Sequence, residues 1–560
     1  MGRKAGPGTW LLVGGLFLFM AAFLFYPLGY VVDRALRPEG HLTWTFVWAV
    51  LSNPASRRAA LNSLLLASVT TMATFVFTLP LSYLAARREF AGKQLLGGLT
   101  LLPLVLPPFV GAIGMKQLLA RFGSVNMLLL DSGLVHSPVD FLGGAKFWGV
   151  VVLQVLHLYP IMYLNVTASL ASVDRGMEEA ARNLGASPFR TFRRVTLPMA
   201  APGVFAGAVI VFIWALTDLG TPLVFEYRDL LSVQIFERVT DMQDNPEGYA
   251  LVLWVLLLTA GGFLVARRLF GSARNVGAAK GGRVTDNPRV RGPALLWVYA
   301  LFGAVVFLSV LPHLSVLLTS LQDDWFMTVL PHKMTFSHYE AALAHPLTIG
   351  SIRNSLVLSS GATMVDALIG VAVAYVLARV RFRGAALLDA MTMLPLALPG
   401  IVVAFGYMGA YAGTAVDPRK DPTVLLIVAY AVRRLPYMVR AAYAGFSQVD
   451  VSLEEAAVNL GAPASRVLWR VTLPLVALSL LAGAILAFSF AMMEVSDSLI
   501  LALREQDYPI TKAIYMLLGR LRDGPEMACA LGVWAMAFLS AALLAAHRIL
   551  GKRMGELFRS

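Results

Sequence analysis

Cysteine is almost absent from this chain. A single cysteine, Cys529, stands among 560 residues, which excludes an intramolecular disulfide and any cysteine-rich metal cluster. Charged residues are also scarce, at 14% of the chain against about 25% in soluble globular proteins. There is no G-x-x-x-x-G-K-[ST] phosphate loop, no H-E-x-x-H pair and no legible Ser/His/Asp set. We therefore expect no catalytic residues, no ATP hydrolysis, no cofactor and no metal site in this chain.

Long apolar runs are what the sequence does contain. Hydrophobic residues make up 58% of the chain. A run of about 20 such residues can cross a bilayer only as a helix, because every backbone polar group must be bonded within the segment. The sequence therefore predicts an all-α membrane protein with about twelve transmembrane helices. The expected spans are residues 10–32, 61–86, 95–115, 147–171, 199–221, 249–269, 294–319, 354–378, 385–411, 423–446, 475–499 and 527–547.

The formal net charge of +13 could indicate a nucleic-acid partner. The distribution of the basic residues favours another explanation, because lysine and arginine cluster in the loops on one side, as the positive-inside rule describes. This pattern predicts a multi-pass protein embedded in the lipid bilayer, with both termini in the cytoplasm and no nucleic-acid partner. Arg419 and Lys420 fall on the outer side and are exceptions to the rule.

One polar stretch occurs twice between apolar runs. Residues 174–198 and 450–474 share the pattern E-E-A-A-x-N-L-G, and both end in R-V-T-L-P. The register is fixed, because 461 − 185 and 474 − 198 both give 276. A single amphipathic loop of this kind would be unremarkable, but two copies in one register favour a docking element.

Local signals divide each copy into a helix, a break and a second short helix. Asp174 and Ser452 are plausible N-caps, and Ser452 with Glu455 fits a capping box. A glycine stands after each first helix, where a left-handed residue would end it. Pro188 and Pro463 suit the first turn of the next helix.

The flanking spans repeat as well, at an offset of 292. Asn62-Ser63-Leu64, for example, matches Asn354-Ser355-Leu356. We therefore expect two homologous six-helix halves, residues 1–270 and 294–560, joined by a basic, glycine-rich cytoplasmic linker at 271–293. Each half has an even number of spans, so both halves enter the membrane from the same side, and an axis along the membrane normal should relate them.

The repeated stretch contains a recognisable set of residues. These are Glu179, Ala180, Ala181, Gly185, Leu197 and Pro198 in the first copy, and Glu455, Ala456, Ala457, Gly461, Leu473 and Pro474 in the second. They match the pattern E-A-A-x-x-x-G followed by L-P, and the stretch resembles the EAA loop of the permease subunits of binding-protein-dependent (type I) ABC importers. Val195 and Val471 stand where isoleucine is usual in that loop.

The resemblance implies a fused, two-half permease of a bacterial or archaeal cytoplasmic (inner) membrane, in which each loop carries a coupling helix. It implies two copies of a cytoplasmic ABC ATPase subunit and an extracytoplasmic substrate-binding protein as partners, with ATP hydrolysis in the separate subunit. In its length, its fused layout and the acidic pair Asp218 and Glu494, the chain most resembles the ferric-iron permeases. Thiamine, phosphonate and polyamine permeases share the overall pattern and stay open as alternatives. An ion-coupled secondary transporter would also show twelve spans and a repeat, and it is the alternative from a different class.

Ionisable residues inside spans are costly in hydrocarbon and are the best pointers to a translocation path. Asp218 and Glu494 are equivalent in the repeat, and they could contact a cationic substrate, or else cap a broken helix or pair with an arginine. Arg433 and Arg434 could hold an anion, or could line a watery cleft or pair with an acid such as Glu494. Prolines should kink or break the third span of each half beside a cavity. They are Pro103, Pro107 and Pro108 in the first half, and Pro395 and Pro399 in the second.

Overall fold

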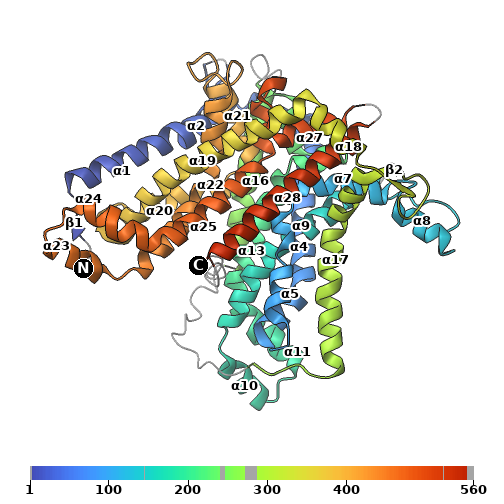
Figure 1. The fold of residues 1–560 in the computed structure, drawn as a ribbon, viewed down its shortest axis with the longest axis horizontal. Coiled ribbons are helices and arrows are strands. Elements are labelled where there is room, and N and C mark those ends of the chain that lie inside the picture. The colour runs from blue at the N-terminus through green and yellow to red at the C-terminus, as the bar shows by residue number, and fades with distance from the viewer. Residues whose placement is uncertain are drawn as a thin grey trace. The chain divides into compact units, whose positions relative to one another are not determined.

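The computed structural model describes residues 3–4, 6–38, 40–143, 146–239, 246–270, 287–520 and 523–550. In this part of the chain the structure is almost entirely helical, which confirms the predicted all-α class (Figure 1). Most of the expected linker, residues 271–286, lies outside the described residues, as does 551–560.

Nine of the described helices are long and apolar enough to cross a membrane, or eleven spans if each of two bent pairs counts as one. A twelfth segment, α22 (Thr423–Gln448), occupies the expected tenth span. It carries three arginines, so composition alone does not mark it as a span. The nine are Pro7–Leu36, Pro54–Arg87, Lys146–Ser172, Ala201–Val224, Glu247–Val265, Pro293–Leu321, Pro346–Arg379, Ala464–Met492 and Gly524–Ala542.

The helices pack into two compact units. Unit 1 comprises residues 1–50, 235–253 and 339–560, and unit 2 comprises residues 51–234 and 254–338. The first long helices of the two halves are exchanged between the units. Unit 1, built mainly from the second half, contains α1 (Pro7–Met20) and α2 (Tyr26–Leu36) of the first half. Unit 2, built mainly from the first half, contains α17 (Pro293–Leu321) of the second half. The two units differ from the two halves that the sequence repeat predicts. The halves divide the sequence, whereas the units are defined by packing, and the halves stay a prediction.

In unit 2, the helices α4 (Pro54–Arg87), α9 (Lys146–Ser172) and α13 (Ala201–Thr217) pack against one another. Gly203 and Gly207 lie one turn apart on α13, and a Cβ on Gly207 would lie only 2.8 Å from the sulfur of a methionine on α9. Small residues therefore permit the close approach of these two helices. The other elements of unit 2 are α5 (Lys93–Leu99), α6 (Leu102–Val105), α7 (Pro108–Leu119), α8 (Ser124–Asp131), α10 (Arg175–Asn183), α11 (Pro188–Thr191), the π-helical turn η2 (Phe192–Thr196), α12 (Leu197–Met199), α14 (Gly220–Val224) and the antiparallel strands β2 (Gln322–Asp324) and β3 (Lys333–Met334).

In unit 1, α19 (Pro346–Arg379), α22 and α25 (Leu473–Met492) pack together, and α2 lies against α21 (Gly400–Ala410). The hydroxyl of Tyr407 on α21 donates to the backbone carbonyl of Phe23 at 2.5 Å, which fixes the N-terminal helices to this unit. The other elements are the parallel pair β1 (Arg3–Lys4) and β4 (Val380–Arg381), the π-helical turns η1 (Ala21–Phe25) and η5 (Leu468–Thr472), α20 (Ala385–Met393), the 3-10 turns η4 (Leu394–Ala397) and η6 (Glu505–Asp507), α23 (Val451–Asn459), α24 (Ala464–Val467), α26 (Ser496–Leu501), α27 (Ile510–Leu518) and α28 (Gly524–Leu550). Four helices cross the boundary between the units: α3 (Thr45–Ser52), α15 (Leu231–Glu237), α16 (Glu247–Phe270) and α18 (Ser337–Ala344).

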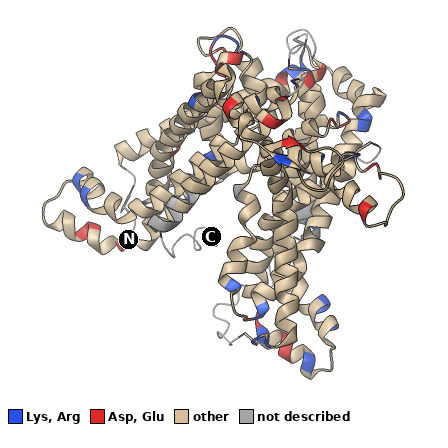
Figure 2. Ribbon diagram, turned by 45° about the vertical axis from the view of Figure 1, so that its right-hand side comes forward, with Lys and Arg blue, Asp and Glu red and all other residues tan. Residues whose placement is uncertain are grey.

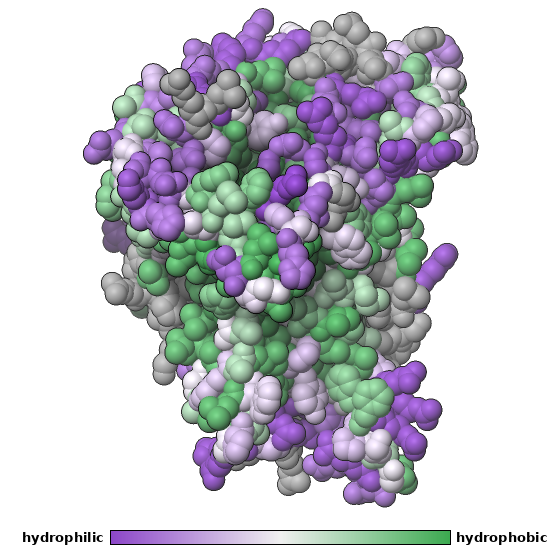
Figure 3. Space-filling view, turned by 90° about the vertical axis from the view of Figure 1, so that its right-hand side faces the viewer, coloured by the Kyte–Doolittle hydropathy of each residue, from purple (hydrophilic) through white to green (hydrophobic). Residues whose placement is uncertain are grey.

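The surface pattern is that of a membrane protein. On the face drawn in Figure 3, hydrophobic side chains form a band between two hydrophilic ends. Charged residues gather in loops and at helix ends, and the middles of the long helices are nearly free of them (Figure 2). Large apolar side chains such as Leu11 and Trp297 are mostly exposed, as expected for contact with lipid.

Candidate functional site

The first copy of the repeated stretch forms the predicted helix, break and helix at the end of the long helices of unit 2 (Figure 1). Asp174 is the N-cap of α10, and its Oδ1 accepts the N–H of Gly176 at 2.9 Å. Gly185 adopts φ +82°, so the predicted left-handed helix end is confirmed. Two backbone bonds close this end in the Schellman pattern, because the N–H groups of Gly185 and Ala186 donate to carbonyls of the last turn at 2.9 and 3.0 Å.

The second copy has the same geometry with one correction at its start. The N-cap of α23 is Asp450, whose Oδ1 accepts the N–H of Ser452 at 2.9 Å. The predicted N-cap Ser452, and its capping box with Glu455, are therefore wrong. Asp450 is the residue that stands 276 positions after Asp174, so the repeat register had more weight than the local motif. Gly461 has φ +87°, which confirms the second helix end.

The second helix of each copy begins differently. Pro188 is the first residue of α11, as predicted, and the Oγ of Ser187 accepts the N–H of Arg190 at 3.3 Å. Pro463 is instead the residue before α24. Both copies then pass through a π-helical turn of five residues, η2 and η5, which leads into the L-P pair at Pro198 or Pro474.

The two coupling-type helices, α10 and α23, each expose one glutamate and several apolar residues, and α10 also exposes Arg182. Glu179 and Glu455 are exposed, as are Ala180 and Ala456, whereas Ala181 and Ala457 are half-buried. The leucine before each glycine is the most open apolar residue of its loop, since Leu184 is 89% and Leu460 is 90% exposed. Exposed leucines at matching places on two polar loops are typical of surfaces that bind another protein.

The first glutamate of each copy is buried, and sequence reasoning missed it. Glu178 and Glu454 are 9% and 5% exposed. Glu178 forms an ion pair with Arg87 of α4 at 3.0 Å, and Glu454 forms one with Arg379 of α19 at 2.9 Å. The repeat contained the necessary signal, because the glutamates are related by 276 and the arginines by the second offset, 292.

Asp218 lies at the break between α13 and α14 in unit 2. Its Oδ2 accepts a hydrogen bond from Nε2 of Gln154 on α9 at 3.2 Å, and its Oδ1 accepts the N–H of Thr221 at 3.3 Å. Its backbone carbonyl accepts the hydroxyl of Ser232 at 2.8 Å. These partners are neutral, and within the described residues Asp218 forms no ion pair.

Glu494 lies at the equivalent break between α25 and α26 in unit 1, but its surroundings are charged. Its carboxylate is 2.5 Å from Nη1 of Arg433, and it also pairs with Arg434. Arg433 lies 3.5 Å from Asp497 as well. The structure thus brings together three of the predicted path residues, Glu494, Arg433 and Arg434, in one buried cluster.

Sequence reasoning also missed Asp366 of α19 in unit 1. It is 1% exposed, and within the described residues its carboxylate oxygens accept no hydrogen bond. The signal was an acidic residue inside a predicted span. The repeat carries no second signal for this position, since its equivalent in the first half is a threonine, Thr74.

The proline pattern correctly predicted a break in each third span. The helix pair Lys93–Leu104 and Pro108–Asp131 is bent by 89°, and the pair Ala385–Ala397 and Gly400–Ala410 is bent by 100°. Pro107 and Pro399 are the N-caps of the helices that follow the breaks, while Pro103 and Pro395 lie in the short helical turns before them.

The break in unit 1 lies beside one of the predicted path residues. A Cβ on Gly400 would overlap the guanidinium of Arg433 in unit 1, so glycine leaves the room that this side chain occupies. In unit 2, Nε2 of His313 on α17 lies 3.2 Å from the carbonyl of Pro107.

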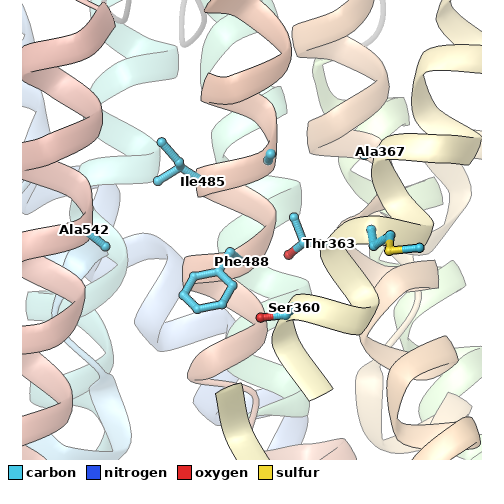
Figure 4. Close-up of a pocket in the computed structure, with 8 residues that line it drawn as sticks. Ser360, Thr363, Ala367, Ile485, Phe488 and Ala542 are labelled. Atoms are coloured by element: carbon cyan, nitrogen blue, oxygen red, sulfur yellow. The ribbon is translucent and has the colours of Figure 1, made fainter. Parts of the chain in front are cut away.

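A shallow, open pocket of about 360 Å³ lies among α19, α25 and α28 in unit 1 (Figure 4). Its lining is almost entirely apolar, and Ile485, Phe488 and Ala542 come from α25 and α28. Two hydroxyl groups, of Ser360 and Thr363, are the polar atoms that Figure 4 labels at its edge. With no ionisable group in its lining, this pocket suits hydrocarbon better than a charged substrate.

The family model for the "Binding-protein-dependent transport system inner membrane component" matches residues 78–323 and again 367–556. The chain belongs to this family. The two matches also support the fused, two-half organisation, and they show a multi-pass inner membrane permease of an ABC importer.

Curated relatives of this permease include proteins named for ferric transport and for molybdenum transport. The "Ferric transport system permease protein FbpB" of Actinobacillus pleuropneumoniae is 29% identical over 83% of this chain and 67% of its own length. A "Putative ferric transport system permease protein" of Haemophilus influenzae is 27% identical over 85% of this chain and 75% of its own length. The "Probable molybdenum ABC transporter permease protein" of Haloferax volcanii is 31% identical, but over only 41% of this chain and 80% of its own length.

Proposed function

We propose that this permease imports ferric iron, which it receives from an extracytoplasmic binding protein, and that two copies of a separate cytoplasmic ATPase drive it. The observation that carries the proposal for the two ATPase sites is the duplicated loop. Each copy combines a capped helix, a left-handed glycine and an exposed leucine, in one register. Two equivalent surfaces on one chain suit two identical partners.

Both loops, both termini and the linker 271–293 would lie in the cytoplasm. This orientation rests on the clusters of lysine and arginine in the loops on that side. The exposed acid and leucine of each loop, such as Glu179 and Leu184, would then meet the ATPase.

Ferric iron is favoured by the extent of the likeness and by the charge of the candidate path. The ferric relatives align with more than four fifths of this chain, whereas the molybdenum relative aligns with less than half. Arg433 and Arg434 both pair with Glu494, and Arg433 also lies 3.5 Å from Asp497. Two carboxylates therefore face the two guanidinium groups, which leaves little positive charge for an oxyanion. Asp218 has neutral partners and keeps a carboxylate for a cation.

Reconstitution tests this function directly. The chain would be placed in proteoliposomes with its cognate ATPase and binding protein, and uptake of radioactive ferric iron would be followed with and without ATP. Uptake that needs ATP, and that survives collapse of the ion gradients, is expected. Uptake of molybdate, thiamine, a phosphonate or a polyamine in place of iron would overturn the substrate, and uptake abolished by ionophores without ATP would favour a secondary transporter.

A further inference from the structure

Each long helix α4 and α19 carries a polar clamp at the end beside the coupling-type helix. In unit 2, Arg87 is the last residue of α4 and is 6% exposed. It donates to Oε1 of Glu178 on α10 at 3.0 Å and to the carbonyl of Val173, just after α9, at 3.1 Å. One buried guanidinium therefore ties together the end of α4, the end of α9 and the first turn of α10.

The clamp is repeated in unit 1. Arg379, the last residue of α19, donates to Oε1 of Glu454 on α23 at 2.9 Å and to the carbonyl of Val449, just after α22, at 2.9 Å. The same three kinds of segment are joined in both copies. Because two separately packed units preserve this arrangement, it is unlike an incidental surface ion pair.

Near the other end of the same helices lies a second polar clamp. In unit 2, Nδ2 of Asn62 donates to the carbonyl of Asp229 at 3.2 Å, and Oγ of Ser63 accepts the N–H of Leu231 at 2.9 Å. Leu231 is the first residue of α15, so Ser63 holds the start of that helix.

Unit 1 repeats the second clamp with the equivalent pair. Nδ2 of Asn354 donates to the carbonyls of Gln506 and Tyr508 at 2.8 and 3.2 Å. Oγ of Ser355 accepts the N–H of Ile510, the first residue of α27, at 2.7 Å. The repeated Asn-Ser-Leu motif of the sequence thus acquires a structural role in both units.

The second clamp leads directly to the acidic residues of the candidate path. The residue after Leu231 is Ser232, whose hydroxyl donates to the carbonyl of Asp218 at 2.8 Å. In unit 1, the residue after Ile510 is Thr511, whose hydroxyl donates to the carbonyl of Glu494 at 2.7 Å. In each unit an unbroken series of contacts therefore runs from a coupling-type helix to the acidic residue at the helix break.

The separation of the two clamps fits a membrane crossing. Arg87 follows Asn62 by 25 residues, and Arg379 follows Asn354 by the same 25. At about 1.5 Å per residue this is ~37 Å, somewhat more than the ~30 Å thickness of a hydrocarbon core. α4 stays one continuous helix through Pro80, and α19 has no internal proline after its first residue.

We propose that α4 and α19 are transmission rods, which carry movement of each coupling helix across the membrane to the break that holds Asp218 or Glu494. The inference rests on the proposed function, because it takes the coupling helices as the sites where the ATPase acts. A helix clamped at both ends by polar groups moves with both neighbours, whereas apolar side chains can slide past one another. In this scheme Arg87, Arg379, Asn62 and Asn354 are positioning residues.

The test uses a reporter at the far clamp of unit 1. Cys529 is fully buried, so Gln506→Cys, at an exposed position, adds one accessible thiol. The full chain would be assembled with its ATPase, and the rate of labelling by N-ethylmaleimide would be compared between nucleotide-free and ATP-vanadate states. We expect a several-fold difference between the two states.

Two variants then break the series of contacts, one at each clamp. Arg379→Met with Glu454→Met removes the first clamp without leaving a lone buried charge, and Asn354→Leu with Ser355→Ala removes the second. Each should abolish the difference in labelling, while the ATPase still copurifies. The control is Arg440→Met with Asp389→Leu, which removes the ion pair at 3.2 Å between α20 and α22, outside both clamps, and should keep the difference.

The outcomes separate this inference from the proposed function. If either clamp variant keeps the nucleotide-dependent difference in labelling, α4 and α19 do not transmit the movement, while ATP-driven import stands. The same conclusion follows if the chain with unaltered clamps shows no difference. If the ATPase does not bind the unaltered chain at all, the proposed function fails first and the rods fail with it.

Discussion

Nη1 of Arg433 lies 2.5 Å from the carboxylate of Glu494, and the residue equivalent to Arg433 in the first half is His157. The two halves therefore differ at matching positions. In unit 1 the acidic residue is held in an ion-paired cluster, whereas the partners of Asp218 in unit 2 are an amide, a hydroxyl and a backbone N–H. Sites that began as copies now have different chemistry, and this separates the expected effects of changing each.

Asp218→Asn should lower transport and leave the fold intact. The amide keeps the shape and one acceptor but removes the negative charge that a cation would meet. Loss of one such charged contact is worth about 1.5–3 kcal/mol, or roughly ten- to a hundredfold in rate. Iron uptake and detergent melting would be measured on the same preparation. A variant that melts early, with uptake reduced only in proportion, would show that Asp218 is structural.

Glu494→Gln should act mainly on stability. It removes the carboxylate from Arg434 and leaves Arg433, among the described residues, with only Asp497 at 3.5 Å. Removal of one member of a buried ion pair typically costs about 3–5 kcal/mol. We expect low expression or a clearly lower melting temperature. Normal melting together with lost transport would instead place Glu494 in contact with the substrate.

A comparison of single and double variants tests whether the first clamp is a buried ion pair. Arg87→Met alone strands the Glu178 carboxylate and should destabilise unit 2 by about 3–5 kcal/mol, whereas Arg87→Met with Glu178→Met should recover most of that loss. Thermal melting in detergent measures both. Equal melting of the two variants would show that solvent reaches the pair and that its charges matter little.

The exposed face of each coupling helix should govern ATPase binding. Glu179→Lys or Glu455→Lys reverses an exposed charge, and should weaken association by about 1 kcal/mol, roughly fivefold in Kd. Gly185→Val or Gly461→Val should distort the helix end, since a left-handed conformation costs a residue with a side chain at least about 1–2 kcal/mol. Copurification of the ATPase and ATP-driven uptake are the readouts. Full activity of all four variants would show that the loop only connects two spans.

Single cysteines test the orientation. Ala186→Cys and Ala462→Cys, one residue beyond the glycines, should be shielded from an impermeant thiol reagent in intact cells and labelled in inverted vesicles, because basic loops face the cytoplasm. Labelling of either site from outside would reverse the layout.

The repeat made much of this structure predictable. Offsets of 276 and 292 located both coupling-type helices, both glycine ends and the proline breaks, because such features are local and depend on a few residues each. Local motifs were weaker guides, since Ser452 matched a capping box although Asp450 is the cap. The ion pairs of Glu178 and Glu454 could not be read locally, because their arginines are 91 and 75 residues away. The repeat marks the two glutamates and the two arginines as equivalent residues, but only the packing shows that they pair.

The exchange of first helices between the units has a consequence for how the chain can be made. Buried side chains of α1, such as Val13 and Leu16, share a core with Val428 and Val432 of α22, and Phe302 of α17 shares one with Tyr159 of α9. A half expressed alone would lack the helix that covers its own core and would carry a helix that covers nothing. Joining both halves in one polypeptide supplies each with its covering helix in a one-to-one ratio during synthesis, whatever the level of expression.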